Sequence, residues 1–162
     1  MNLDLLTRAA ALLDTYKAKG WMIATAESCT GGLVAGLLTE IAGSSAVVER
    51  GFVTYSNEAK SELVGVPATL IAEHGAVSEP VARAMAEGAL ARSRAHAAVA
   101  ITGVAGPGGS TEAKPVGLVW FALAVRDRPT VAVERRFGEL GRGRVREHSV
   151  EQAVALLEEA VA

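Results

Sequence analysis

A small polar cluster follows the first apolar stretch of the chain. Residues 21–26 (WMIATA) form an apolar run of strand length, and Ser28-Cys29-Thr30-Gly31-Gly32 comes just after it. Apolar residues at helical spacing begin at Leu33. A strand, turn and helix in this order place a hydroxyl beside unpaired backbone N–H groups, where an alkoxide and an oxyanion are stabilised. Ser28 is therefore a candidate nucleophile, and the alternative is that Ser28 or Thr30 only caps the helix.

A second polar cluster, residues 55–60 (YSNEAK), follows another β-rich stretch and contains a lysine. Lys60 can serve as a general base if burial and nearby positive potential lower its pKa, and serine with lysine is a known nucleophile–base pair. Tyr55, five residues earlier, could orient Lys60 or relay a proton. The alternatives are a solvated Lys60 on an exposed helix face and a Tyr55 that packs at the edge of the core.

A third cluster, residues 102–110 (TGVAGPGGS), follows the apolar run 97–102. It lacks the Gly-Lys-Ser/Thr of a P-loop, and a strand rather than a helix follows it, so it is not a dinucleotide fingerprint. Successive glycines can still turn their N–H groups toward an anion. The alternative is a mobile loop.

Two further features could take part in chemistry. Cys29, next to Ser28, is a rival nucleophile if a helix N-terminus lowers its pKa, although a free cysteine is more often a small buried residue. Arg142, Arg144 and Arg146 start the last helical stretch, where cations oppose the helix dipole. An anionic ligand would relieve this, so one of the three could contact a phosphate.

Strand-like and helical stretches alternate along the chain and predict the elements that position these clusters. Helices are expected at about 3–19, 30–41, 57–63, 68–74, 79–93 and in the C-terminal region. Strands are expected at about 22–26, 46–55, 97–102, 116–125 and 131–137, the last two as a hairpin. This order predicts a three-layer α/β/α domain over residues 1–162, with a mixed, mostly parallel sheet of about five strands. Ligands in such sheets bind at the carboxyl ends of the strands, so the three clusters should line one crevice.

The composition excludes several classes of protein. The net charge of −2 gives no basic field for nucleic acid. No apolar run approaches the ~20 residues that span a bilayer, so we expect no membrane partner. A single cysteine and the lack of a signal-peptide pattern fit the cytoplasm, and the three histidines show no metal-ligand spacing. We therefore expect neither a metal nor another cofactor.

Five ordered motifs identify a resemblance that covers nearly the whole chain. They are residues 25–32 (TAESCTGG), 51–60 (GFVTYSNEAK), 75–78 (GAVS), 101–109 (ITGVAGPGG) and 114–117 (KPVG). Together they resemble the CinA C-terminal domain family, whose stand-alone members are nicotinamide-nucleotide amidases. Longer members carry a separate N-terminal domain linked with pyrophosphatase-type activity, which we do not expect here.

The resemblance implies hydrolysis of the carboxamide of nicotinamide mononucleotide, in pyridine nucleotide recycling, by a homodimer or higher homo-oligomer. It implies Ser28 as nucleophile and Lys60 as base, with Tyr55 assisting. The Gly-rich loop, with Thr102, Gly103, Gly106, Gly108 and Gly109, forms part of the substrate pocket. With these roles, we expect N–H groups near Thr30, Gly31 and Gly32 to hold the oxyanion, and Arg142 to contact the phosphate. The alternative from another class is a non-catalytic module that binds pyridine nucleotides.

Overall fold

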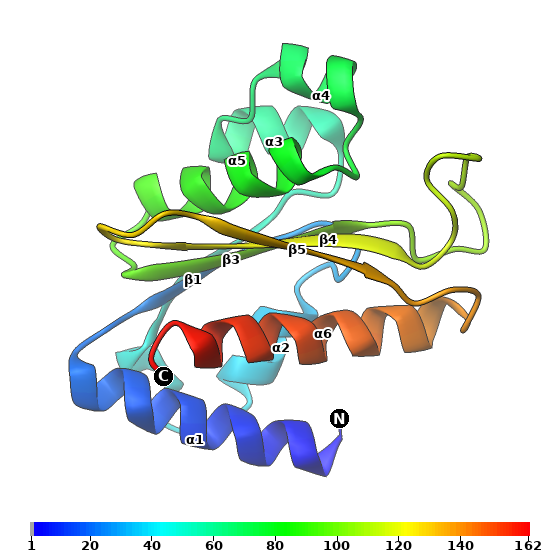
Figure 1. Ribbon diagram of the computed structural model, residues 1–162. Helices are drawn as coiled ribbons and strands as arrows, with labels where there is room; N and C mark the ends of the chain where they lie inside the picture. The colour runs from blue at the N-terminus through cyan, green and yellow to red at the C-terminus, as the bar shows by residue number, and fades with distance from the viewer. Residues whose placement is uncertain (1) are drawn as a thin grey trace.

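The computed structural model describes residues 2–162 and has one five-stranded sheet in the order β2-β1-β3-β4-β5 (Figure 1). The strands β2, β1 and β3 pair in parallel, whereas β4 is antiparallel to both β3 and β5. Four strands therefore run in the same direction, which confirms the mixed, mostly parallel sheet. The strands are β1 (Ile23–Glu27), β2 (Val48–Val53), β3 (Ala97–Gly103), β4 (Leu118–Val125) and β5 (Val131–Arg136).

Helices cover both faces of the sheet (Figure 1). On one face α2 (Leu33–Thr39) and α6 (Arg142–Glu159) contact the strands, and α1 (Leu3–Lys19) packs outside them. On the other face α5 (Glu79–Ala91) contacts β1, β3, β4 and β5, and α3 (Asn57–Val64) and α4 (Ala68–His74) pack against α5. A short 3-10 turn, η1 (Ser44–Ala46), precedes β2. The fold is thus the predicted α/β/α arrangement, with α1 forming an additional outer layer.

The small aliphatic residues of the sequence explain how closely α5 lies on the sheet. Because side chains alternate along a strand, the hydrophobic residues that β1 and β3 present to the α5 face are all alanines. Their opposite faces carry larger residues such as Ile23, Val99 and Ile101, which pack toward α2 and α6. Both strands are buried, as expected for the centre of a sheet covered on both faces.

The structure corrects the predicted boundaries near the first two strands. The helix expected over 30–41 spans only Leu33–Thr39, because residues 28–32 form a turn in which Gly31 and Gly32 have positive φ. The stretch 46–55 divides into η1 and β2, with a register shift beside Ile23. Gly51 marks a close approach, since a Cβ atom there would lie 2.7 Å from Thr25 Oγ1.

One close contact fixes α3, the helix that carries Lys60, against α5. A Cβ atom built on Gly88 of α5 would lie 1.8 Å from the carbonyl oxygen of Val64, at the end of α3. Any side chain at residue 88 would therefore push the two helices apart. The α3 helix itself begins at Ser56, whose hydroxyl accepts a hydrogen bond from the Ala59 N–H at 3.0 Å.

We expect Gly88→Ala to lower the free energy of unfolding by ~3 kcal/mol, because the new methyl group overlaps a backbone oxygen that cannot move freely. Urea unfolding followed by circular dichroism measures the change. Gly36→Ala is the matched control, since a Cβ atom at that helical glycine meets no atom within 4 Å. Equal stability of the two variants would contradict the proposed contact.

Candidate active site

The three polar clusters meet at one end of the sheet. Because β2, β1 and β3 are parallel neighbours, the residues after all three strands lie at the same edge. They surround a cleft of about 260 Å³. Nine of the predicted site residues line it: Ser28, Tyr55, Lys60, Thr102, Gly103, Gly106, Gly108, Gly109 and Arg142.

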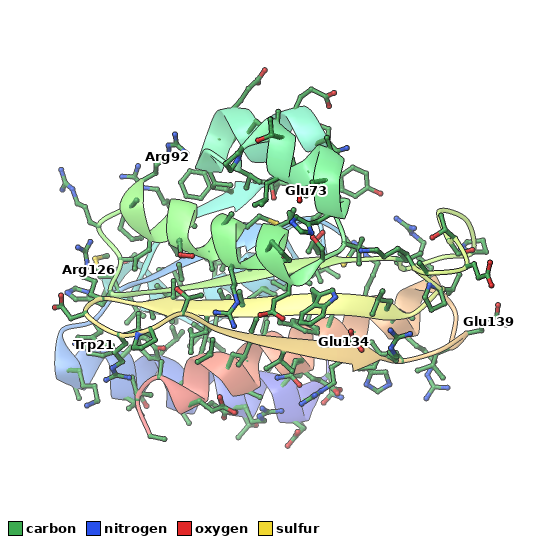
Figure 2. All side chains as sticks on the ribbon, turned by 45° about the horizontal axis from the view of Figure 1, so that its top comes forward. Trp21, Glu73, Arg92, Arg126, Glu134 and Glu139 are labelled. Atoms are coloured by element: carbon green, nitrogen blue, oxygen red, sulfur yellow. The ribbon has the colours of Figure 1, made fainter. Side chains whose placement is uncertain are left out.

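Figure 2 helps to locate this edge, because Trp21, which precedes β1, lies at one end of the sheet and Glu139, which precedes α6, lies at the other. The long loop after β3 extends on the Glu139 side (Figures 1 and 2). The cleft is therefore on this side, at the carboxyl ends of the parallel strands, where open α/β sheets bind ligands.

Ser28 and Lys60 are in direct contact. Lys60 Nζ lies 3.1 Å from Ser28 Oγ, and it donates to the carbonyl oxygens of Thr54 at 2.9 Å and Tyr55 at 3.4 Å. The side chain of Lys60 is 1% exposed, which overturns the alternative of a solvated lysine. Burial lowers the pKa of Lys60, because a charged amine is poorly solvated there.

The acceptors around Lys60 suit a neutral amine as well as an ammonium. A neutral amine has two N–H bonds and one lone pair. With the two N–H bonds on the Thr54 and Tyr55 carbonyls, the lone pair faces Ser28 Oγ. The arrangement can therefore accept the Ser28 proton without any rotation of the lysine side chain.

Glu27, rather than Ser28 or Thr30, caps α2. Its carboxylate accepts hydrogen bonds from the N–H groups of Val34 at 2.9 Å and Ala35 at 3.1 Å. It also accepts one from the Thr30 hydroxyl at 2.7 Å. The interpretation of Ser28 or Thr30 as a cap is wrong, because these helix N–H groups already have a buried anionic partner. The same contacts leave Ser28 Oγ free to face Lys60.

One of the predicted oxyanion donors, the Gly31 N–H, is already paired. The Gly31 N–H donates to the Ser28 carbonyl oxygen at 3.0 Å and is not free. Within residues 2–162, no acceptor meets the N–H groups of Cys29, Thr30 and Gly32; Gly32 is partly exposed, whereas Cys29 and Thr30 are the two buried residues of this set. Unpaired buried N–H groups are rare, so these two are the better candidates to hold an oxyanion.

Thr30, Gly31 and Gly32 do not line the cleft. The Thr30 hydroxyl is directed to Glu27, and Thr30 is fully buried. A Cβ atom on Gly31 would face Arg146, and one on Gly32 would face Val53. The structure thus places the side-chain positions of these three residues in the wall behind Ser28, so any contact with a substrate is limited to their unpaired backbone N–H groups.

The Tyr55 side chain points away from Lys60. Its ring is largely exposed, and its hydroxyl accepts a hydrogen bond from Arg142 Nη2 at 3.2 Å. Only the Tyr55 carbonyl oxygen reaches the pair, at 3.5 Å from Ser28 Oγ. The phenol therefore has no contact with Lys60 through which it could relay a proton. The exposure of the ring also contradicts the alternative prediction that Tyr55 packs at the edge of the core.

Arg142 is the arginine that lies over the cleft. Besides Tyr55, it donates from Nη1 to the Gly106 carbonyl oxygen at 3.0 Å, which connects α6 with the Gly-rich loop. Arg146 instead donates to the carbonyl oxygens of Cys29 at 3.1 Å and Thr30 at 3.4 Å. Arg144 is exposed and lines no part of the cleft.

The remaining wall comes from residues that lie in the motifs of the sequence analysis but to which it assigned no individual role. Asn57, Ala76 and Val77 line the cleft. The Thr102 hydroxyl donates to the Ala76 carbonyl oxygen at 2.9 Å, and Lys114 donates to the carbonyl oxygen of Val77. These links join the loop after β3 to the segment before α5. The resemblance already included the motifs 51–60, 75–78 and 114–117, but the hydrogen bonds between them depend on long-range packing that no local pattern predicts.

Cys29 lines the cleft but is not poised as a nucleophile. Burial raises the pKa of its thiol to about 12, so the thiolate is scarce near neutral pH. Among residues 2–162, no group of three or more His, Cys, Asp or Glu side chains is arranged to hold a metal ion. Over the same residues, no helix combines the length and the apolar character needed to cross a membrane.

Known proteins match this chain along almost its whole length. The CinA C-terminal domain matches residues 6–161. The chain belongs to the CinA C-terminal domain family. Within this family, the nicotinamide-nucleotide amidohydrolase PncC of Escherichia coli (strain K12) is 63% identical over 68% of this chain and 67% of its own length. A CinA-like protein of Mycolicibacterium gilvum is 54% identical over 98% of this chain, which spans 38% of that relative.

Solved structures of the family have the same fold. The competence/damage inducible protein CihA from Agrobacterium tumefaciens has a TM-score of 0.95 at 49% identity, over 99% of both chains. A CinA superfamily protein from Escherichia coli has a TM-score of 0.91 at 33% identity, over 96% of this chain and 90% of its own. The resemblance expected from the five motifs is therefore confirmed.

Proposed function

We propose that the protein hydrolyses the carboxamide of nicotinamide mononucleotide to nicotinate mononucleotide and ammonia, with Ser28 as nucleophile and Lys60 as general base. The observation that carries this proposal is the buried contact of 3.1 Å between Lys60 Nζ and Ser28 Oγ in a polar cleft. The 63% identical relative named nicotinamide-nucleotide amidohydrolase supports the choice of substrate.

The reaction proceeds through an acyl-enzyme. Ser28 Oγ attacks the amide carbon while its proton moves to Lys60 Nζ, and the N–H groups of Cys29 and Thr30 bind the oxyanion. When the C–N bond breaks, the nitrogen takes the proton from Lys60 and leaves as ammonia. Water then attacks the ester, Lys60 accepts a water proton, and the bond to Ser28 breaks as Ser28 is reprotonated.

The rest of the cleft binds the nucleotide. The Gly-rich loop after β3 and the guanidinium of Arg142 would hold the 5′-phosphate, as expected for an arginine facing an anion. The phenol of Tyr55, which accepts a hydrogen bond from Arg142, would orient this guanidinium. Tyr55 therefore assists binding in this account, whereas the sequence analysis expected it to assist Lys60.

We expect Ser28→Ala and Lys60→Arg each to lower kcat for ammonia release by ~10³-fold or more, because they remove the nucleophile and the group that accepts its proton. Arginine keeps the positive charge of Lys60 but does not release its proton. Ammonia release from nicotinamide mononucleotide, measured beside wild type, tests both changes. Turnover near the wild-type value in Ser28→Ala would exclude this mechanism.

Wild-type protein that binds the nucleotide saturably in calorimetry, but releases no ammonia, would favour the non-catalytic binding module instead. The buried pair argues against that alternative, because burial of a lysine beside a serine contributes nothing to binding a phosphate. A different amide substrate would be sought next by screening pyridine nucleotides.

For Arg142→Ala, we expect KM for nicotinamide mononucleotide to rise by ~10-fold or more, because a charge-assisted contact with the phosphate is lost. The KM for nicotinamide riboside, which lacks the phosphate, should stay the same. Arg144→Ala is the matched control, since that side chain lies two residues away and off the cleft. Equal effects on the two substrates would contradict a phosphate contact.

A further inference from the structure

The turn that carries the nucleophile has little internal support. Within the turn and the start of α2, the backbone bonds run from Gly31 N–H to the Ser28 carbonyl, from Leu33 N–H to the Thr30 carbonyl and from Gly36 N–H to the Gly32 carbonyl. The Ser28 N–H itself donates to the Ile101 carbonyl of β3 at 2.9 Å, which leaves residues 29–32 with few backbone bonds of their own. Gly31 and Gly32 both have positive φ, a conformation that glycine adopts easily. Glycine also loses more conformational freedom on folding than other residues, so these two residues do little to hold the turn in one conformation. The geometry of Ser28 must therefore depend on groups outside the turn.

One outside support lies beneath the turn. Glu27 is 1% exposed, and its carboxylate binds the Thr30 hydroxyl together with two N–H groups of α2. Three donors thus converge on one buried anion, and one of them belongs to the turn itself. The Thr30 hydroxyl is the link that transmits the position of Glu27 and α2 to the turn.

A second support lies on the side of α6. Arg146 binds the carbonyl oxygens of Cys29 and Thr30, the two residues that follow the nucleophile. The Cys29 carbonyl and the Thr30 N–H belong to the same trans peptide group and point in opposite directions. A cationic donor on the carbonyl fixes the direction of that N–H and polarises it, which makes it a stronger donor.

We infer that Glu27, through Thr30, and Arg146 are positioning residues that hold the Ser28 turn and its unpaired N–H groups in the geometry that binds the oxyanion. This inference rests on the proposed function, because it assigns the turn a role in that reaction. Neither residue lines the cleft, so neither is expected to contact the substrate. Since the oxyanion forms only in the transition state, loss of either support should lower kcat and leave KM unchanged.

The test compares three threonine variants. Thr30→Val removes the hydroxyl without changing the side-chain shape, and we expect kcat for ammonia release to fall by ~10-fold or more, with KM within about twofold of wild type. Thr30→Ser keeps the hydroxyl and should restore kcat to near wild type. Thr25→Val, on the strand that precedes the turn, is the matched control, because the buried Thr25 hydroxyl has no hydrogen-bond partner within residues 2–162.

A merely structural role for Thr30 would lower the melting temperature without this pattern in kcat. The inference is overturned if Thr30→Val has the same kcat as Thr25→Val, or if Thr30→Val raises KM instead of lowering kcat. It is also overturned if folded Thr30→Ser has a kcat as low as that of Thr30→Val. If Thr30→Val does not fold, Arg146→Lys decides, because its side chain is only half-buried. A wild-type kcat in Arg146→Lys would overturn the inference.

A second measurement tests the positioning role independently of the proposed substrate. A fluorophosphonate probe labels an activated serine: the Ser28 oxygen attacks phosphorus, fluoride leaves, and the serine proton moves to Lys60. The phosphoryl oxygen occupies the oxyanion position, so labelling should slow by ~10-fold or more in Thr30→Val and remain normal in Thr25→Val. If wild type labels but releases no ammonia, the proposed substrate fails, and these labelling rates still decide the positioning role.

Discussion

The burial of the Lys60 amine against Ser28 is the interaction on which the site depends. Its acceptors are a hydroxyl and two carbonyl oxygens, which solvate an ammonium less well than water does. Burial therefore lowers the pKa of Lys60 below that of the unfolded chain. Between these two pKa values the unfolded chain binds the additional proton, so the free energy of unfolding rises with pH there. The lowered pKa therefore makes the fold less stable at neutral pH than an unshifted lysine would, and in the proposed function the amine accepts the proton of Ser28.

The rest of the fold keeps this costly contact in place. The N-cap at Ser56 and the Gly88 contact with Val64 fix α3, which brings Lys60 in from one face of the sheet. Ser28 follows β1 on a turn that is bound by Glu27 at the end of β1 and by Arg146 of α6. Lys60 thus comes from a helix on one face of the sheet and Ser28 from the turn between β1 and α2, and the two side chains meet at the carboxyl end of β1. The surrounding elements, rather than an ion pair with a carboxylate, therefore hold together two side chains that are 32 residues apart in sequence.

Sequence patterns predicted the elements and the pair, but not the contacts that surround them. Alternating strands and helices predicted the sheet and most helix boundaries, because the periodicity of apolar residues is local. The parallel order of the strands then placed Ser28, Lys60 and the Gly-rich loop at one edge. The capping by Glu27, the contact of Tyr55 with Arg142 and the carbonyls bound by Arg146 depend on side-chain directions across elements. No local spacing encodes those directions, so the sequence assigned Thr30 to the substrate and Tyr55 to Lys60.

Titration of Lys60 tests the central claim most directly. The signal of its ε-carbon can be followed by nuclear magnetic resonance against pH and assigned by its loss in Lys60→Arg. We expect its midpoint below the ordinary lysine value of about 10.4, and we expect Ser28→Ala to leave it lowered, because burial is the main cause. A midpoint at the ordinary value would contradict the account, since Lys60 would then be charged at neutral pH and unable to accept the proton of Ser28.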